Sequence, residues 1–596
     1  MRLPGVSRGL RPGHKPLISI SRSHRRAYNL AVVGGGITGL TSAWQASHDA
    51  ACSGITLYEK EPRLGGWLQS EKVPVDDGHV LFEYGPRTLR NSFPSSWPLL
   101  IMIQELGLLD QVITTPKNSP AARNRFVYYP DHLVKIPTPK KSIESIWNLF
   151  QELRSEPLFD KLLSSMLLEP TKPPRPHSEW QRDESIASFI SRRFHPKVAD
   201  NLVSALAHGV YAGDIDQLSA QTILGPLRNM DDVGLFRGTI DKLVQKKMPL
   251  LMDDFIGWAA VHKSYQWKAQ GQGILSLTRE SSTFTLKGGT KQLVEGLQNA
   301  LNKSGKVKIM TGTDIKAMTR WQGSDSISIQ AAKSGTQRFD RVIAAIPPRA
   351  LSSILESRTN HPNEKAPPHD TINKLRLHDY ATTIMVVNLY YPNPKLLPVN
   401  GFGYLIPRSV PADQNPECGL GVIFASATST GKSALYPDRE ESQDTAHGTK
   451  LTIMMGGHYW DGWKDSDYPD HESAVKMART MLQRHLGITD APTVARSRLQ
   501  KNAVPQYTVG HLDRMYSLSN TVRNDFNRRL VLAGNWYNGT SVGNCVRAGV
   551  VASTLSIGRA TLPDTGQKFQ PWRDYNYRDW DFEGGIPTAP IQYFDF

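Results

Sequence analysis

Short runs of apolar residues that end in glycine turns recur along the chain, and each is followed by a segment with helical spacing. The first lies in NLAVVGGGITGL, which starts at residue 29. A second stretch, LKGGTKQLVEGLQNALNK (286–303), leads into VKIMTGTDIKAM and DRVIAAIP, and a third, LVLAGNWYNGTSVGNCVRAGVVAS, spans 530–553. Continuous apolar runs bounded by turns predict buried strands. The pattern indicates an α/β fold in which one domain is assembled from three separate segments.

From 139 to 205 the pattern is helical, interrupted by the proline-rich loop EPTKPPRPHSEW. Apolar residues after the cations Lys140 and Lys141 share one helical face: Ile143, Ile146, Trp147, Phe150 and Leu153. Such a face usually packs against a protein core, but it can also lie in a membrane interface. No run of 18 or more apolar residues occurs, so the sequence predicts no transmembrane helix and only peripheral membrane contact.

The first glycine turn has the spacing of a dinucleotide site. Gly34-x-Gly36-x-x-Gly39 follows a strand-like run and opens a helix. In a βαβ unit the first glycine makes the turn, the second lets the backbone approach a pyrophosphate, and the third lets helix and strand pack closely. Glu59 ends the next apolar run, where an acidic residue accepts ribose hydroxyls. The combination favours a dinucleotide over a plain tight turn.

The residues that follow favour FAD as the dinucleotide. A second Gly-Gly turn, RLGGW (63–67), comes directly after Glu59, and FEYGPR (82–87) comes next, where a nicotinamide dehydrogenase usually has another βα unit. The order Glu-x-x-x-Arg-x-Gly-Gly resembles that of the flavin-dependent amine oxidase superfamily. The resemblance implies a Rossmann-like FAD-binding domain of the amine oxidase or p-hydroxybenzoate hydroxylase type.

Further motifs resemble the mitochondrial, oxygen-dependent protoporphyrinogen oxidases: ARNRFVYYP, HGVYAGD, LPVNGFGYLIP, KNAVPQYTVGH and LAGNWYNGTSVGNC. The resemblance implies a discontinuous FAD-binding domain (28–115, 282–346, 500–560), a mixed-sheet substrate domain (116–135, 213–281, 347–499) and a helical membrane-binding domain (136–212). Residues 1–27 are expected to be a transit peptide. The stretch around 240–280 and the tail 561–596 exceed the compact family pattern and have no assigned role.

The same resemblance implies the site residues. For non-covalent FAD, one per chain, they are Gly34, Gly35, Gly36, Ile37, Thr38, Gly39, Glu59, Lys60, Arg63, Gly66, Trp67, Gly85, Pro86, Arg87, Thr88, Val307, Asn535, Trp536, Thr540, Ser541 and Val542. For the porphyrinogen, Phe402, Gly403, Leu405 and Met454 would contact the apolar macrocycle, and Arg125 would hold a propionate, because a guanidinium matches a carboxylate bidentately. No catalytic side chain and no metal are expected, since the flavin carries the chemistry.

The family implies an oxidation of protoporphyrinogen IX that removes six electrons, with molecular oxygen as acceptor and three hydrogen peroxide per product. It also implies an inner-membrane location on the intermembrane-space side, with a homodimer and a hand-over of product to ferrochelatase as further partners. The leader agrees with import, because the first acidic residue is Asp49 and arginines and serines dominate before it. The formal net charge of +15 suits an anionic membrane surface. No interleaved basic and aromatic motif suggests nucleic acid.

Three cysteines far apart, Cys52, Cys418 and Cys545, offer no disulfide framework or CxxC metal site. Two other functions stay open. An amine or polyamine oxidase on the same fold would use an aromatic cage, for which Trp536 and Tyr537 are placed. The Rab escort and GDP-dissociation-inhibitor proteins share the fold but lack an intact flavin site. Cys545 lies in the last flavin motif and could attach to the ring, against which the family resemblance argues.

Overall fold

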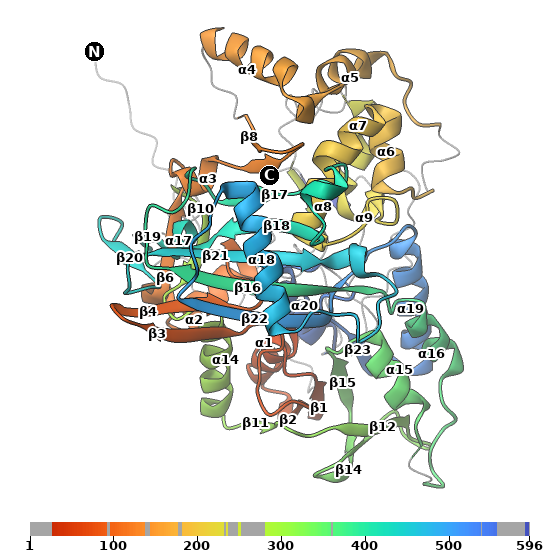
Figure 1. The fold of residues 1–596 in the computed structure, drawn as a ribbon. Helices are drawn as coiled ribbons and strands as arrows, with labels where there is room; N and C mark the ends of the chain where they lie inside the picture. Colours follow the sequence, from red (N-terminus) through yellow and green to blue (C-terminus); the bar gives the residue numbers. More distant parts are fainter. Residues whose placement is uncertain are drawn as a thin grey trace, which may run out of the picture.

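The computed structural model describes residues 27–91, 96–137, 143–176, 182–231, 234–235, 248–251, 280–358, 361–537, 539–556 and 591–594. For residues 143–146, 248–251 and 591–594 it describes the backbone alone. The expected transit peptide, apart from residue 27, therefore lies outside the described residues. Lys140 and Lys141 lie outside them as well. Figure 1 shows a parallel sheet at one end of the molecule, a large mixed sheet in the middle and a helical unit at the other end.

The parallel sheet has the strand order β11-β2-β1-β15-β23. Val33 is in register with Tyr58 and Ala344, so all strands point their carboxyl ends to one edge. The strands come from the three segments that the glycine turns predict: β1 (Tyr28–Val33), β2 (Cys52–Tyr58), β11 (Val307–Met310), β15 (Arg341–Ala344) and β23 (Leu530–Leu532). The discontinuous assembly of this domain is thus present in the structure.

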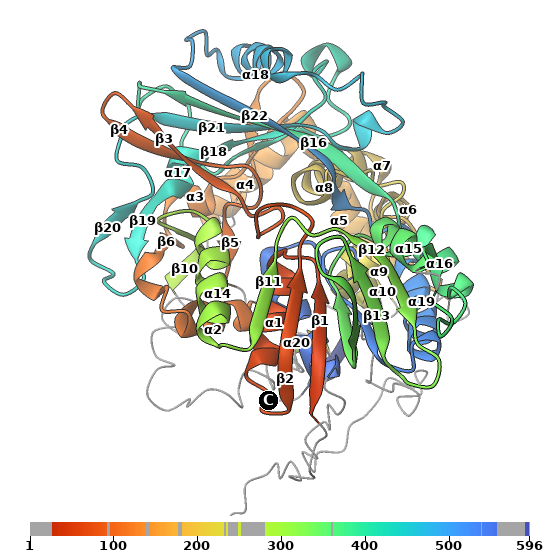
Figure 2. The same ribbon diagram turned by 90° about the horizontal axis from the view of Figure 1, so that it is seen from below.

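Helices cover both faces of the parallel sheet (Figure 2). Leu30 and Val32 of β1 face the core beneath α1 (Ile37–Ser47), α14 (Lys291–Lys303) and α20 (Val542–Ser556). Ala31 and Val33 alternate to the other face. There they share a core with a three-stranded sheet and three further helices: β12 (Ile315–Arg320), β13 (Ile327–Ala331), β14 (Gly335–Phe339), α15 (Pro348–Glu356), α16 (His369–Arg376) and α19 (His511–Asp525).

This second core corrects one predicted boundary. The sequence reading ends the middle nucleotide segment at 346, but Leu351 and Leu355 of α15 and Ile372 of α16 are buried in the same core as Val33. The two helices present an amphipathic face, and the parallel sheet is the apolar surface that buries it. Residues 348–376 therefore belong with the nucleotide-binding domain.

The mixed sheet has the order β22-β16-β21-β18-β17-β7-β8. Its strands are β7 (Phe126–Tyr128), β8 (Leu133–Lys135), β16 (Ala381–Tyr391), β17 (Gly403–Leu405), β18 (Gly419–Phe424), β21 (Thr449–Gly456) and β22 (Val494–Pro505). Neighbours are antiparallel except β7 and β17, which are parallel. Helix α18 (His471–Leu486) packs on one face through Ala474, Ala478 and Met481. The prediction assigns residues 500–505 to the nucleotide-binding domain. They lie in the mixed sheet instead, because β22 pairs with β16.

Smaller sheets connect the two domains. One has the order β20-β19-β6-β10-β5, and the hairpin of β3 and β4 forms another. Their strands are β3 (Ser70–Val75), β4 (Gly78–Glu83), β5 (Leu89–Arg90), β6 (Val112–Pro116), β10 (Ser281–Leu286), β19 (Thr430–Ser433) and β20 (Glu440–Ser442); α2 (Trp97–Glu105) follows β5. Of the two unassigned stretches, residues 248–251 (β9) pair antiparallel with residues 591–594 (β24).

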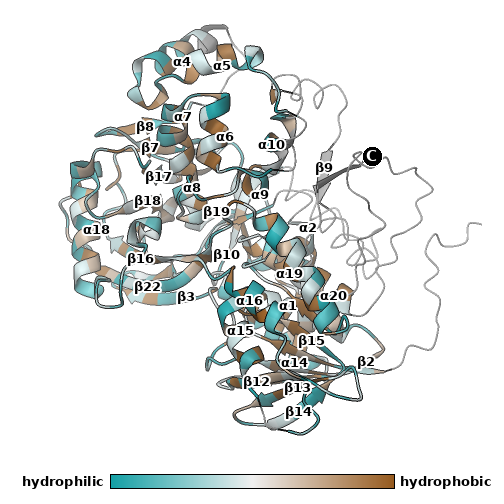
Figure 3. Ribbon diagram, turned by 90° about the vertical axis from the view of Figure 1, so that its right-hand side faces the viewer, coloured by the Kyte–Doolittle hydropathy of each residue, from teal (hydrophilic) through white to brown (hydrophobic). Residues whose placement is uncertain are grey.

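The helical unit contains α4 (Ile143–Ser155), α5 (Leu162–Leu168), α6 (Ile186–Arg193), α7 (Pro196–Val198), α8 (Ser204–Tyr211), α9 (Ala220–Ile223) and α10 (Gly225–Asp231). Its core includes Phe189 and Ile190 but also Ile215, Leu218 and Ala220. The predicted end at 212 is therefore too early, because the apolar residues after it complete the same core. Helices α4 and α5 stand at the outer end, away from the parallel sheet (Figures 1 and 3).

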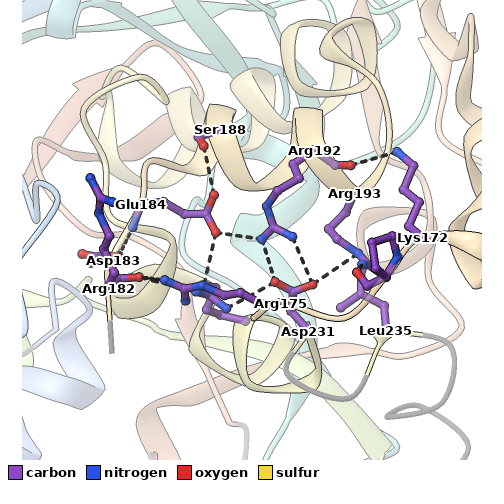
Figure 4. Close-up of polar contacts among 12 residues, drawn as sticks. Lys172, Arg175, Arg182, Asp183, Glu184, Ser188, Arg192, Arg193, Asp231 and Leu235 are labelled. Atoms are coloured by element: carbon purple, nitrogen blue, oxygen red, sulfur yellow. Dashed lines mark hydrogen bonds and ion pairs between the residues drawn. The ribbon is translucent and has the colours of Figure 1, made fainter. Parts of the chain in front are cut away.

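A network of ion pairs connects the helices of this unit (Figure 4). The fully buried Asp231 accepts from Arg192 at 2.6 Å and lies 3.3 Å from both Arg193 and Arg228. Glu184 binds Arg192 at 2.8 Å. The network links α6, α10 and the segment before α6. No helix in the described part of the chain is long and apolar enough to cross a membrane.

Candidate active site

The first glycine turn has the geometry that its sequence predicts. The amide of Gly34 donates to the carbonyl of Tyr58 at 2.8 Å, with φ at 103°. A Cβ on Gly39 would lie 1.9 Å from the carbonyl oxygen of Gly34, so helix α1 packs directly on the turn. A Cβ on Gly36 would meet nothing within 4 Å. Helix α1 begins there with no side-chain cap and no acidic residue in its first turn, which leaves its amides to an anion. Ile37 and Thr38, also predicted, form that first turn.

The second glycine turn lies against the first. Gly65 pairs with Gly36 in an isolated parallel bridge, and its amide donates to the carbonyl of Gly35 at 2.8 Å. Arg63 donates to the carbonyl of Gly66 at 2.6 Å. A Cβ on Gly85 would lie 2.1 Å from the carbonyl oxygen of Trp67, which brings GPRT (85–88) to the same place. The structure therefore brings these predicted cofactor residues together.

Glu59 stands at the carboxyl edge of the sheet beside the turn. Its Oε2 accepts from the amide of Gly35 at 2.7 Å, and its Oε1 accepts from the amide of Glu61 at 2.9 Å. Lys60 is exposed and forms only a surface ion pair with Glu61 at 3.8 Å. Glu59 is thus held at this edge by two backbone amides, whereas the Lys60 side chain extends into solvent.

Val307 is not brought to this edge. It is in register with Ile55, at the amino end of β11, three residues before Met310 meets Tyr58. The backbone beside Glu59 comes from later residues: the amide of Thr313 donates to the carbonyl of Glu59 at 2.8 Å. The turn after the strand, Thr311–Asp314, was missed because a turn without an apolar pattern carries no signal of its own.

The C-terminal segment closes the site through helix α20. The hydroxyl of Thr38 donates to the carbonyl of Cys545 at 3.2 Å, and a Cβ on Gly549 would lie 2.6 Å from the carbonyl of Thr38. The first turn of α1 thus packs against α20 between Cys545 and Gly549. Ser541 caps α20 by accepting from the amide of Asn544 at 3.2 Å. Thr540, Ser541 and Val542, which were predicted, stand at this start, and Asn535 accepts from the hydroxyl of Tyr507 through its carbonyl.

Two enclosed polar atoms in this site have no hydrogen-bond partner among the described residues: Nη1 of Arg87 and Oγ1 of Thr88. Burial lowers the pKa of Arg87 to about 10, and the charge of Glu83 opposes that shift. Buried donors of this kind need an acceptor, because an unmade hydrogen bond costs the full desolvation of the group. Together with the open space at Gly36, these atoms fit FAD, whose pyrophosphate and ring carry acceptors.

Glu83 is a buried carboxyl group that links the motif FEYGPR to helix α14. It was not among the residues predicted for the site. Its carboxylate accepts from the amide of Thr290 at 2.7 Å and from the hydroxyl of Ser70 at 2.7 Å. It thereby caps the start of α14 by hydrogen bonds. Burial raises the pKa of Glu83 to about 7. Glu83 lies within FEYGPR, so the signal that could have found it is that motif itself.

On the substrate side, Arg125 and Phe402 are neighbours. The guanidinium carbon of Arg125 lies 4.3 Å from the centre of the Phe402 ring, and one of its N–H groups donates to the carbonyl of Ala121. Burial lowers the pKa of Arg125, and the positive charge of Arg90 lowers it further. A cation held over an aromatic ring beside a second cation suits the carboxylate edge of a flat, apolar ligand.

Leu405 and Met454 share one row of the mixed sheet. Leu405 is in register with Gly421, and Gly421 with Met454, so the three residues face the same side. This side is opposite the face that α18 covers, because Tyr404 and Met455 pack there. A Cβ on Gly421 would lie 3.0 Å from Cδ2 of Leu405, so the side chain of Leu405 extends over this glycine.

Gly403, which is expected to contact the macrocycle, is required by the backbone of the sheet itself. A Cβ there would lie 2.1 Å from the carbonyl oxygen of Val422, and φ is 142°. The close approach of β18 therefore requires a glycine. Phe402 precedes β17, so the alternation of side chains between the two faces of that strand does not apply to it. Phe402 and Leu405 can therefore both belong to the proposed site.

Helix α8 faces this row, and the sequence reading named none of its residues individually. A Cβ on Gly209 would lie 2.6 Å from Cδ2 of Leu405. Leu206 and Val210, one turn apart, are exposed large apolar side chains on the same helical face. Figure 1 shows α8 beside β17 and β18. The motif HGVYAGD covers this helix and was the available signal. Helix α8 therefore packs directly against this row at Gly209 and leaves Leu206 and Val210 exposed.

Trp536 and Tyr537 do not form an open aromatic cage. They are 7% and 1% exposed and pack in the core of the nucleotide-binding domain with Leu532 and Met515. Cys545 is also buried, and burial raises the pKa of its thiol to about 11. A thiol held protonated is a poor nucleophile. Neither feature favours the amine oxidase or a covalent flavin.

Comparisons with known proteins agree with this geometry. The profile of the flavin containing amine oxidoreductases matches residues 37–555. A protoporphyrinogen oxidase of Schizosaccharomyces pombe is 32% identical over 532 residues, which cover 87% of this chain and 97% of that protein. The chain belongs to the protoporphyrinogen oxidases of the flavin-containing amine oxidoreductase family. It is therefore a flavin-dependent oxidoreductase, and the resemblance found in its motifs is confirmed.

The human protoporphyrinogen oxidase is 28% identical over 541 residues, covering 89% of this chain and 98% of the human protein. Among solved structures, a bacterial protein from Exiguobacterium assigned as a protoporphyrinogen oxidase superposes with a TM-score of 0.64 at 20% identity, covering 88% of this chain and 98% of that one. A redesigned putrescine oxidase reaches 0.54 at 14% identity, covering 89% and 99%. These structural likenesses confirm the fold class.

Proposed function

We propose that this protein oxidises protoporphyrinogen IX to protoporphyrin IX in haem synthesis. The change removes six hydrogens, so with molecular oxygen as final acceptor it requires three two-electron rounds and yields three hydrogen peroxide. The observation that carries the proposal is the Arg125–Phe402 pair at 4.3 Å, next to the strand that places Leu405 in one row with Met454. This arrangement offers a flat apolar wall with a cation at one edge, the complement of a macrocycle with propionates.

One non-covalent FAD per chain would be held by residues of all three segments. Gly36 and the start of α1 would receive the pyrophosphate, Glu59 the ribose, and Arg87 and Thr88 would donate to acceptors that the cofactor brings. When bound, the flavin supplies a hydride acceptor at N5. Acid precipitation should release the yellow colour into the supernatant. Colour that stays in the pellet would show a covalent link and contradict this part.

The chain's own residues would act by positioning and by excluding water. Arg125 is fixed by the carbonyl of Ala121 and by the Phe402 ring, so its remaining N–H groups can meet a propionate with little loss of freedom. Leu405 and Met454 would contact one face of the macrocycle. Fixed orientation of the reacting carbon is where most of the protein's contribution would lie.

The decisive test is a fluorescence assay with purified protein. Protoporphyrinogen IX is not fluorescent and its product is, so a rise in porphyrin emission with release of peroxide would support the proposal. Polyamines are assayed beside it for peroxide alone. Turnover of polyamines without porphyrin formation would overturn the proposal in favour of an amine oxidase.

We also propose a peripheral place on the mitochondrial inner membrane, facing the intermembrane space, after removal of the leader. Support comes from α4 and α5, where Trp147 and Leu167 are 62% and 78% exposed and Phe150, Met166 and Leu168 are exposed as well. Contiguous exposed apolar side chains mark interaction surfaces. A homodimer and transfer of the product to ferrochelatase complete the proposal. Sedimentation of the detergent-purified enzyme tests the first, and co-purification from mitochondria tests the second.

A further inference from the structure

Side chains of the mixed sheet hold the chain at the point where β4 leads into the predicted flavin segment GPRT (85–88). Nδ2 of Asn388 in β16 donates to the carbonyl of Glu83 at 3.0 Å. Nε2 of Gln500 in β22 donates to the carbonyl of Tyr84 at 3.0 Å. Tyr84 is the last residue before GPRT. Two hydrogen bonds from the mixed sheet therefore fix the place at which the chain enters the flavin site.

Thr452 orients the side chain of Asn388. The two residues are opposite each other in β21 and β16, and the hydroxyl of Thr452 donates to Oδ1 of Asn388 at 2.6 Å. With Oδ1 engaged as acceptor, Nδ2 is the end of the amide that meets the carbonyl of Glu83. Asn388 and Thr452 are each 1% exposed, so water does not compete for either hydrogen bond.

The same face of β21 also carries a predicted substrate residue. Lys450, Thr452 and Met454 point to one side, because alternate residues of a strand share a face. Nζ of Lys450 donates to the carbonyl of Leu81 in β4 at 2.6 Å. One strand therefore holds β4 through Lys450, orients Asn388 through Thr452 and, two residues later, presents Met454.

The distance between flavin and substrate matters for the reaction. A misplacement of about 1 Å between reacting groups can cost about a hundredfold in rate. The flavin segment lies outside the mixed sheet that carries Leu405 and Met454, so contacts between the two must fix their separation. Hydrogen bonds suit this task, because they weaken steeply when their distance and angle change.

We propose that Asn388, oriented by Thr452, is a positioning residue that sets the separation between flavin and substrate for hydride transfer. The proposal rests on the proposed function for the identity of the substrate. It concerns the hydride step and not binding, because the assigned pyrophosphate site at Gly36 and the Arg125–Phe402 pair do not include these side chains. The affinities for flavin and porphyrin should therefore change little.

The test uses flavin-loaded protein and protoporphyrinogen IX without oxygen, and it follows the loss of flavin absorbance at saturating substrate. Asn388→Leu keeps the size of the side chain and removes both hydrogen bonds. We expect the rate constant of flavin reduction to fall about tenfold or more. The KM and the dissociation constant for protoporphyrin IX should stay within about threefold of the original, so that the loss appears in kcat.

Three threonine variants provide the matched comparison. Thr452→Val removes the hydroxyl that orients Asn388 and should slow flavin reduction about fivefold, whereas Thr452→Ser keeps it and should stay within about twofold. Thr449 lies in the same strand, is 2% exposed and donates to the carbonyl of Asn393 at 2.7 Å. Thr449→Val loses a comparable hydrogen bond without affecting β4. It should lower the unfolding midpoint as Thr452→Val does and leave flavin reduction unchanged.

A second readout does not depend on turnover. The visible circular dichroism of the bound flavin reports the asymmetry of its surroundings in the absence of substrate. Because a displaced GPRT segment changes these surroundings, the spectrum should change in Asn388→Leu and Thr452→Val. It should stay unchanged in Thr449→Val and Thr452→Ser.

The outcomes separate this inference from the proposed function. If protoporphyrinogen IX does not reduce the flavin of the unaltered protein, the proposed function is overturned, and the role of Asn388 in that reaction with it. If reduction is normal there and equally fast in Asn388→Leu, only the positioning role is overturned. Equal slowing by Thr449→Val and Thr452→Val would also overturn it, as would loss of flavin in step with the loss of rate. Should Asn388→Leu not fold, Thr452→Val decides, and an undiminished rate there would overturn the positioning role.

Discussion

The guanidinium of Arg125 lies 4.3 Å over the ring of Phe402, although the two residues come from motifs far apart in the sequence. The cause is the parallel pairing of β7 with β17, which puts Phe126 in register with Tyr404. The amide of Phe402 also donates to the carbonyl of Asn124 at 3.1 Å. Backbone pairing between the two segments therefore brings the guanidinium of Arg125 next to the ring of Phe402.

Replacing Arg125 with alanine should raise KM for the porphyrinogen. The change removes a charge-assisted bond worth about 1.5–3 kcal/mol, so KM should rise about tenfold or more, and kcat should fall only if the macrocycle is misoriented. Arg125→Lys keeps the charge but loses the bidentate geometry, so its KM should lie between those of the unaltered protein and Arg125→Ala. The porphyrin fluorescence assay measures both constants. An unchanged KM in Arg125→Ala would remove Arg125 from the substrate site.

Two glycines of the first turn should respond differently to alanine. Gly36→Ala meets nothing within 4 Å and should fold normally, but its methyl group would occupy the space we assign to the pyrophosphate, so the purified protein should lose flavin. Gly39→Ala places Cβ 1.9 Å from the carbonyl oxygen of Gly34 and should destabilise the fold itself. Thermal unfolding followed by circular dichroism and the flavin absorbance separate the two effects. Full flavin content in a well-folded Gly36→Ala protein would speak against this placement.

Charging the outer helices should release the protein from membranes. Trp147 and Phe150 stack with ring centres 6.1 Å apart on the exposed side of α4, and a glutamate at either position would both remove apolar area and be repelled by anionic lipid. Binding to vesicles that contain anionic lipid should fall in Trp147→Glu and Phe150→Glu, while porphyrin formation in detergent stays unchanged. Tyr436→Glu, at an exposed aromatic residue near β20, is the control. Unchanged vesicle binding by both α4 variants would refute this anchor.

The buried Asp231 should matter far more for stability than an exposed acid. Asp231→Asn leaves Arg192, Arg193 and Arg228 without their shared carboxylate, and breaking a buried ion pair costs about 3–5 kcal/mol. Asp370→Asn removes only the exposed partner of Lys374 and should cost about 1 kcal/mol or less. Chemical unfolding compares the two variants. Equal midpoints would mean that the helical unit does not depend on the network.

Four buried histidines should make the fold sensitive to acid. Burial lowers the pKa of His208, His485 and His511 to about 4 and that of His378 to about 3. The unfolded chain binds these protons near pH 6.5 and the folded one does not, so stability is complete above about pH 6.5 and falls toward pH 4. Each histidine contributes a slope of up to about 1.4 kcal/mol per pH unit.

Glu83 works in the opposite direction, because burial raises its pKa to about 7 and the folded state then holds a proton that the unfolded chain has released. Its contribution is lost as pH rises from about 4.5 to 7. The four histidines outweigh it, so the unfolding midpoint should decline between pH 6.5 and 4.5. His485→Gln should make the decline of the unfolding midpoint with falling pH less steep. A midpoint that is flat over this range would contradict the histidine assignment.

The sequence by itself determined the local geometry of the nucleotide end. Gly34, Gly36, Gly39 and Glu59 could be placed in advance because each position depends on backbone geometry within one strand–turn–helix unit, and a tight turn requires particular residues. For the same reason the three recurring strand–turn–helix segments predicted a sheet that the chain leaves and re-enters.

Only the tertiary structure decided what depends on pairing between distant segments. Strand register placed Leu405, Gly421 and Met454 in one row, moved Val307 away from the cofactor edge and gave Gly403 its reason in the nearby carbonyl of Val422. Helices α15 and α16 joined the nucleotide core because an amphipathic face does not state which apolar surface will bury it. The contact between Asn388 and Glu83 has no sequence signal at all, since two residues 305 positions apart become partners only when two sheets meet.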